Sequence, residues 1–309
     1  MRARFGVAGV GLALAPTVLT NAQLEDRMDT TDAWIRERTG IIERRTGGTT
    51  ASLAVEAARD ALAAAGEVTN LAAIIVATST ADEAVPSVAS RVADDLGSTA
   101  ATFDLNGACA GFVYALAAAT PFLDSGAAVL LVGSDAMTRI TDPDDRATAI
   151  LFGDGAGAMV VVGDSGTDGG LLGFDAGTQP ASHDLLYCPL GGTIQMQGQA
   201  VFRLAVRAAV DSAVAALDDA GLSTTDVDLF VPHQANQRIT DALAQRLDLS
   251  RERVMSTIAT TGNSSAATIP HALALAERQG RIGDGAIVLL SGFGAGMTWA
   301  SAAMRWRRK

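Results

Sequence analysis

The chain has 309 residues, of which 49% are hydrophobic and 18% are charged, and this composition excludes a disordered protein. A formal net charge of −11 argues against nucleic acid as a general partner, and no apolar run reaches the ~18–20 residues that span a bilayer. The only cysteines, Cys109 and Cys188, lack the spacing of a CxxC motif or a disulfide framework, which is typical of a reducing compartment. We therefore expect a cytoplasmic protein with a large buried core and with neither a nucleic acid nor a membrane as partner.

The first segment, residues 2–16, places basic residues before an apolar stretch, as a signal peptide does. Gly6, Gly9 and Gly11 interrupt the stretch, and no small-residue cleavage site follows cleanly. The segment is therefore predicted to form a first β-strand, with a signal peptide as the alternative.

Two pairs of segments repeat each other at low identity. Residues 53–80 and 202–236 each contain a helix pattern that ends at a glycine, then a linker and an apolar strand. Residues 125–133 and 284–292 form a second match at nearly the same offset. Two matches at one offset favour an internal duplication over a single domain with chance similarity.

Apolar strands alternate with helix patterns in both halves. The runs 74–77 and 287–290 are continuously apolar, which is typical of strands that are covered on both faces. We therefore expect helices to sandwich two mainly parallel sheets. The Gly- and Asp-rich segment 163–169 is the predicted boundary between an N-terminal half, residues 1–165, and a C-terminal half, residues 166–309.

Cys109 follows a tight bend of small residues, and a helix pattern over 112–119 leads away from it. At a helix N-terminus the dipole and the free amides stabilise a thiolate and are expected to lower the pKa below the reference of ~8.5. A lone cysteine among alanines and glycines is more often a packed small hydrophobe. These residues alone leave the two interpretations even.

His233 follows the apolar strand 229–232 and precedes a helix pattern. It is therefore predicted to lie at the carboxyl end of a buried strand, where site residues are expected. A buried histidine bonded to the backbone is the alternative. The other two histidines, His183 and His271, are expected to be structural or solvated.

Asn263 stands in a turn of small residues before a helix predicted over 269–279. The internal repeat makes this turn the counterpart of the Cys109 turn, so Cys109 and Asn263 are predicted to occupy equivalent positions across a pseudo-twofold axis. Capping the helix is the simpler role for an asparagine here, but the symmetry makes that role insufficient alone.

Six separated and ordered motifs, spread over essentially the whole chain, resemble those of β-ketoacyl-ACP synthase III, the initiating condensing enzyme of bacterial fatty-acid synthesis. The motifs occupy residues 31–41, 108–112, 152–158, 231–236, 262–267 and 294–299. The resemblance implies a thiolase-like layered α-β-α-β-α fold made of two duplicated halves, with Cys109, His233 and Asn263 as the catalytic residues.

The resemblance further implies a ping-pong reaction that needs neither a metal nor a redox cofactor. Cys109 would take an acyl group from acyl-CoA, and the enolate formed by decarboxylation of malonyl-ACP would attack the acyl-cysteine. His233 and Asn263 would hydrogen-bond the malonyl thioester oxygen, while the backbone amides of Cys109 and Ala295 would form the oxyanion hole. The region of Phe293 lacks the second cysteine of biosynthetic thiolases, and Asn263 stands where elongating synthases carry a second histidine.

The resemblance also assigns substrate-binding residues. Trp34, Arg38 and Arg146 would line the CoA tunnel, where an indole and a guanidinium can sandwich an adenine. The other expected contacts, with the pantetheine arm or beside the cysteine, are Thr30, Gly198, Phe202, Asn236, Arg238 and Phe293.

The acidic carrier protein requires a local basic patch, because the net charge of the chain is negative. The predicted patch consists of Arg203, Arg207, Arg238 and Arg246. A solvated helix face is the simpler role for Arg207.

Val85 stands where acetyl-preferring relatives often carry phenylalanine, in a loop that in the family reaches into the acyl pocket of a partner subunit. A homodimer and a longer or branched primer are therefore expected. Alternatives with similar chemistry are a starter-unit ketosynthase of a polyketide pathway and a non-condensing acyltransferase. A cysteine hydrolase and a non-catalytic partner subunit are alternatives from other classes. The Asn106-Gly107 pair departs from the two alanines that are usual before the cysteine.

Overall fold

The continuously apolar segments form strands of one nine-stranded mixed sheet in the computed structural model, which describes residues 1–309. In spatial order the strands are β11 (Leu229–Pro232), β12 (Ile287–Gly294), β13 (Thr298–Arg305), β8 (Gly170–Thr178), β1 (Ala3–Leu14), β7 (Asp154–Gly163), β6 (Ala128–Ala136), β4 (Leu71–Ala77) and β5 (Ala101–Leu105). The first segment of the chain supplies β1, so the prediction of a strand there is confirmed.

The order of the strands reflects the internal repeat. From the junction outward, one side reads β1, β7, β6, β4 and the other reads β8, β13, β12, β11, with β5 as an additional edge strand beside β4. The two sets meet where β1 pairs with β8 over only two residue pairs, Ala3 with Leu171 and Arg4 with Gly170. The Gly- and Asp-rich segment connects β7 to β8.

The prediction of two mainly parallel sheets is wrong. Only β4 with β5, β4 with β6, and β11 with β12 are parallel, and the other five strand pairs are antiparallel. The turn 295–297 joins β12 directly to β13, and a connection this short permits only an antiparallel pair. Apolarity on both faces of a strand indicated burial but carried no information about direction.

The helices cover both faces of the sheet and fill the space between its halves. They are α1 (Asn21–Glu25), α2 (Asp32–Thr39), α3 (Thr50–Ala65), α4 (Val88–Leu96), α5 (Gly111–Ala119), α6 (Arg146–Ala149), α7 (Gly198–Ala220), α8 (Gln237–Arg246), α9 (Ile258–Thr261) and α10 (Thr268–Arg278). The remaining short strands are β2 (Thr17–Thr20), β3 (Glu43–Thr46), β9 (Leu186–Tyr187) and β10 (Gln195–Met196). None of the helices combines the length and the apolar character needed to cross a bilayer.

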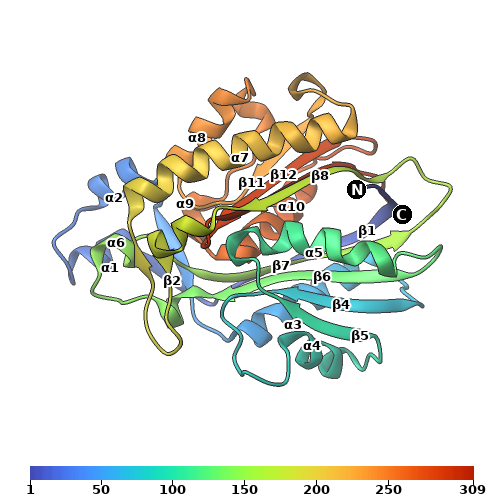
Figure 1. The fold of residues 1–309 in the computed structure, drawn as a ribbon. Helices are drawn as coiled ribbons and strands as arrows, with labels where there is room; N and C mark the ends of the chain where they lie inside the picture. Colours follow the sequence, from blue (N-terminus) through green and yellow to red (C-terminus); the bar gives the residue numbers. More distant parts are fainter.

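Five layers alternate in the predicted order α-β-α-β-α (Figure 1). The central layer consists of α5 and α10, which contact strands of both halves. The outer layers are α3 with α4 on one side and α7 with α8 on the other. Both central helices begin at the turns that contain the candidate site residues, so the layering brings those turns together between the sheet halves.

The central layer packs so closely on the sheet that glycine is required at the contact. A Cβ atom at Gly157 on β7 would lie 2.3 Å from the backbone nitrogen of His271 on α10. Helix and strand backbones therefore touch here with no side chain between them.

We expect Gly157→Ala to lower the free energy of unfolding by about 1–3 kcal/mol, because the added methyl group has to push α10 away from β7. Urea denaturation measures the change. Gly283→Ala is the matched control, since its Cβ would meet no atom within 4 Å, and it should stay within about 0.5 kcal/mol of the parent. Equal effects of the two substitutions would contradict the close packing.

Candidate active site

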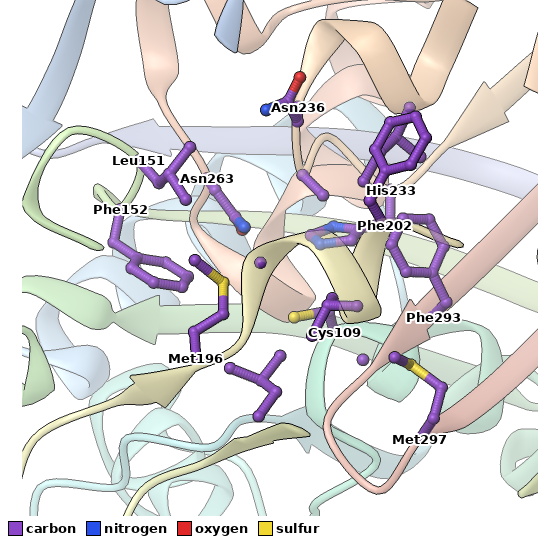
Figure 2. Close-up of a pocket in the computed structure, with 16 residues that line it drawn as sticks. Cys109, Leu151, Phe152, Met196, Phe202, His233, Asn236, Asn263, Phe293 and Met297 are labelled. Carbon is purple, nitrogen blue, oxygen red and sulfur yellow. The ribbon is translucent and has the colours of Figure 1, made fainter. Parts of the chain in front are cut away.

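Cys109, His233 and Asn263 lie far apart in the sequence but line the same cavity. Figure 2 shows the thiol, the imidazole and the amide converging on this cavity. The rest of the wall is mainly apolar and includes Phe152 and Met196. The cavity therefore offers a few polar groups in a wall that otherwise suits a hydrocarbon chain.

Cys109 lies in the 3-10 helix η1 (Ala108–Ala110), which leads directly into α5. Ala108 has a φ of 48°, an unusual conformation for a residue with a side chain. The Asn106 side-chain oxygen accepts a hydrogen bond of 3.1 Å from the Ala108 amide and holds this bend. The prediction that the cysteine is at a helix N-terminus is confirmed.

The second half contains an equivalent turn. The 3-10 helix η7 (Ser265–Ala267) leads into α10, and Ser265 has a φ of 53°. The Asn263 side-chain oxygen accepts a hydrogen bond of 2.9 Å from the Ser265 amide, as Asn106 does from Ala108.

The two turns therefore correspond, as predicted, but the predicted pairing of residues within them is wrong. Superposing the residues of positive φ, Ala108 and Ser265, places Asn106 opposite Asn263. Cys109 then corresponds to Ala266 and has no polar counterpart in the second half. The internal repeat did not reveal this, because the backbone conformation of the bend fixes the alignment of the two turns.

The predicted lowering of the Cys109 pKa is also wrong for the unliganded protein. Burial raises the pKa of this thiol to about 12, and the Asp135 carboxylate adds to the rise. The Ser265 side chain and the Cys109 amide oppose the rise without overcoming it. With the side chain only 8% exposed, the loss of hydration outweighs the stabilisation by the helix terminus.

Asp135, which the sequence analysis did not identify, is a fully buried carboxylate that connects the two halves beneath the site. It accepts hydrogen bonds of 2.7 Å from the Ser79 amide, after β4, and of 3.0 Å from the Ala266 amide, in η7. Thr78 and Thr80 donate their hydroxyl protons to the same carboxylate. The available signal was a single acidic residue within the otherwise apolar run of β6.

His233 follows β11, and its amide donates a hydrogen bond of 2.8 Å to Ser291 on the neighbouring strand. Its ring nitrogen Nδ1 lies 2.7 Å from the Thr268 hydroxyl, and its ring forms a T-shaped pair with that of Phe293 at a centroid distance of 5.2 Å. Burial lowers the pKa of His233 to about 3, so the imidazole is neutral at physiological pH. No hydrogen bond joins it to Cys109.

Asn263 is fixed on both sides of its backbone. Its amide donates to Leu151 at 2.9 Å, and its carbonyl accepts from Gly153 at 3.0 Å. The Ser265 amide donates its hydrogen bond to the side-chain oxygen of Asn263, so the side-chain NH₂ group is the end that faces the cavity (Figure 2). The asparagine thus caps the first amide of η7 and presents a donor at the same time.

The residues predicted for the CoA tunnel lie together. The guanidinium carbons of Arg146 and Arg38 lie 5.0 Å and 6.0 Å from the Trp34 ring centroid. Asn236 donates a hydrogen bond of 3.1 Å to the Arg38 carbonyl and so joins α8 to α2.

The predicted contacts of the pantetheine arm connect this cluster to the cavity. Gly198, Phe202, Asn236 and Phe293 line the cavity itself, and Arg238 lies 5.9 Å from the Phe202 ring. The Thr30 hydroxyl is buried without a hydrogen-bond partner.

Other predicted residues lie outside the cavity. Val85 is 83% exposed, and Ala295 lies half-buried in the turn between β12 and β13. Arg203, Arg207 and Arg246 are exposed on α7 and α8. Arg207 forms an exposed pair with Asp211 at 3.7 Å, as expected of a solvated helix face.

The five alternating layers, with a cysteine at the turn into a central helix, define a thiolase-like protein of the condensing acyltransferase class. Residues 103–180 match the family model of 3-oxoacyl-[acyl-carrier-protein (ACP)] synthase III, and residues 217–306 match the model of its C-terminal part. The β-ketoacyl-[acyl-carrier-protein] synthase III of Geobacillus kaustophilus is 45% identical over 98% of this chain and 99% of its own.

Solved structures of related synthases have the same fold as this chain. The crystal structure of 3-oxoacyl-(acyl carrier protein) synthase III from Pseudomonas aeruginosa has a TM-score of 0.93 and 45% identity, covering 98% of both chains. The priming β-ketosynthase of the R1128 polyketide pathway has a TM-score of 0.92 and 36% identity, covering 99% of this chain and 97% of its own. The chain belongs to the β-ketoacyl-ACP synthase III family.

The raised pKa of Cys109 has a consequence for its reactivity. We expect the rate of Cys109 alkylation by iodoacetamide to rise about tenfold per pH unit between about pH 7 and 10, because the thiolate is the nucleophile. Peptide mass spectrometry of a Cys188→Ala variant follows Cys109 alone, with N-acetylcysteine as the unburied control. A plateau of the rate below about pH 8 would show instead that the helix terminus stabilises the thiolate.

Proposed function

We propose that this chain condenses an acyl-CoA primer with malonyl-ACP to give 3-ketoacyl-ACP, CoA and CO₂, the initiating step of fatty-acid synthesis. The observation that supports this most strongly is the meeting of one thiol with two neutral nitrogen-bearing side chains, His233 and Asn263, in a single apolar cavity. Membership of the synthase III family supports the same reaction.

In the first step, the Cys109 sulfur attacks the thioester carbonyl of acyl-CoA. A bond forms between this sulfur and the acyl carbon, the bond to the CoA sulfur breaks, and the thiol proton leaves with CoA. Because burial keeps the thiol protonated, its deprotonation accompanies substrate binding. The amides of Cys109 and Ala295 bind the oxyanion, a role supported by the contact of Gly294, which precedes Ala295, with the Cys109 backbone.

In the second step, malonyl-ACP loses CO₂ and the carbon of its enolate forms a bond to the acyl carbon held on Cys109. The bond between that carbon and the Cys109 sulfur breaks, and the released thiolate takes up a proton. Negative charge develops on the malonyl thioester oxygen during decarboxylation. His233 and Asn263 each donate a hydrogen bond to that oxygen, and removing one such donor typically costs about 10²–10³ in rate. Neutral donors suit the step, because the cavity is too deeply buried to stabilise an imidazolium.

The substrates enter past Trp34. Arg38 and Arg146 hold the adenine and phosphate groups of CoA, for which a planar cation beside an indole is well suited. Thr30, Gly198, Phe202, Asn236, Arg238 and Phe293 flank the pantetheine arm or the thioester.

An acidic carrier protein docks on the basic patch formed by Arg203, Arg207, Arg238 and Arg246 on α7 and α8. Arg207 contributes least, because Asp211 already pairs with it. The reaction needs no metal or redox cofactor, since the loss of CO₂ drives it.

We also propose a cytoplasmic homodimer. The almost fully exposed Val85 is the side chain that a second copy would cover. Two free cysteines are compatible with a reducing compartment. A starter-unit ketosynthase of a polyketide pathway is the second candidate, favoured by the likeness to the R1128 enzyme, although the identity of 36% is lower than that to the fatty-acid enzymes.

Intact-mass spectrometry tests the reaction. We expect one acyl adduct per chain after exposure to acyl-CoA, and its loss with formation of 3-ketoacyl-ACP when malonyl-ACP is added. Cys109→Ala should remove the adduct completely, whereas Cys188→Ala should leave it unchanged. Absence of an adduct with every acyl-CoA from two to twelve or so carbons, roughly the range of common primers, would refute the proposal.

Val85 tests the choice of primer. We expect the parent protein to accept primers longer or more branched than acetyl, and Val85→Phe to reduce kcat/KM for those primers about tenfold or more relative to acetyl-CoA. Val214→Phe places the same side chain at another exposed valine, on α7, and should change nothing. An exclusive preference of the parent for acetyl-CoA would contradict the role assigned to Val85.

A further inference from the structure

Thr268, the first residue of α10, contacts the imidazole of His233 at its Nδ1 atom. It is buried, and its hydroxyl oxygen lies 2.7 Å from His233 Nδ1. The hydroxyl is also placed to donate to the Ser265 carbonyl at 3.0 Å, and its oxygen accepts a hydrogen bond of 3.3 Å from the Gln234 amide.

The single proton of the Thr268 hydroxyl has two acceptors within reach, the Ser265 carbonyl and His233 Nδ1. A threonine hydroxyl has one proton to donate, and the Gln234 N–H already donates to its oxygen. The Ser265 carbonyl has a hydrogen-bond donor without the hydroxyl, because it accepts the backbone N–H of Thr268. His233 Nδ1 has no other hydrogen-bond partner, so directing the hydroxyl proton to Nδ1 leaves both acceptors satisfied.

We propose that Thr268 is a positioning residue that donates its hydroxyl proton to His233 Nδ1 and thereby keeps the imidazole proton on Nε2. In a neutral imidazole one nitrogen carries the proton and the other accepts, so the partner of Nδ1 decides the role of Nε2. Nε2 makes no hydrogen bond within the protein, and the ring lines the cavity. Nε2 therefore presents an N–H to a bound substrate.

The junction of η7 with α10 then fixes which end of each side chain, Asn263 and His233, faces the cavity. Ser265 in η7 holds the oxygen of Asn263 and leaves its NH₂ group toward the cavity. Thr268, three residues further on, does the same for His233 by occupying Nδ1. Two N–H groups directed into one cavity form a site for a developing oxyanion. The catalytic meaning of this arrangement rests on the proposed condensation, but the tautomer itself does not.

Nitrogen-15 NMR of histidine-labelled protein measures the tautomer directly, without a substrate. The chain has only three histidines, so His183→Gln and His271→Gln variants assign the His233 signals. We expect a protonated Nε2 and an unprotonated Nδ1 for His233. A protonated Nδ1 with an unprotonated Nε2 would overturn the inference.

The second measurement uses Thr268→Val, which keeps the shape of the side chain and removes the hydroxyl. We expect a mixture of tautomers and a loss of condensation rate approaching the ~10²-fold cost of removing a donor. Acylation of Cys109 by acyl-CoA should remain within about twofold of the parent, because this step does not use Nε2. Thr268→Ser keeps the hydroxyl and should retain both the tautomer and the rate.

Thr240→Val is the matched control, since it removes a buried hydroxyl that has no hydrogen-bond partner, and it should leave both readouts unchanged. If Thr268→Val condenses at the parental rate, or if Thr268→Ser loses as much as Thr268→Val, the positioning role is refuted. If the parent shows the expected tautomer but does not condense, the proposed function fails while the tautomer assignment stands.

Discussion

Each of the two turns that form the site rests on a glycine in the other half of the molecule. A Cβ at Gly133 on β6 would lie 2.3 Å from the carbonyl oxygen of Ala266 in η7, and one at Gly292 on β12 would lie 2.7 Å from the Cα of Ala110 in η1. In each half, the backbone of a strand therefore touches the backbone of the turn that belongs to the other half, on either side of the pseudo-twofold axis. Neither turn can adopt its position without the other half, so the cavity exists only when both halves are folded together.

This reciprocal contact also explains the electrostatic character of the site. Packing without intervening side chains excludes water, and burial keeps the Cys109 thiol, with a pKa raised to about 12, and the His233 imidazole, with a pKa lowered to about 3, in their neutral forms. Polar groups in such surroundings act through the direction of their hydrogen bonds more than through charge. The buried carboxylate of Asp135 is surrounded by donors from both halves and secures the turns rather than facing the cavity.

Much of the fold and the main candidates for the site were predictable from local patterns. Apolar runs located the strands, and small-residue turns before apolar helices located Cys109 and Asn263. The errors arose where a prediction needed geometry that apolarity does not encode. Strand direction depended on the turn between β12 and β13, and the alignment of the two turns depended on the backbone conformation of Ala108 and Ser265. Asp135 escaped notice because its partners come from separate segments of the chain.

The sequence by itself determined the duplicated layered architecture, the family and the identity of the polar residues in the cavity, because repeats, periodicity and motif spacing are properties of the chain alone. Only the tertiary structure decided the protonation of Cys109 and His233 and the direction in which Asn263 presents its amide. Those properties depend on burial and on partners such as Thr268 and Ser265, which approach from other elements or through a bend in the backbone. A pKa and a hydrogen-bond direction are set by the surroundings of a group, and these surroundings are complete only in the folded protein.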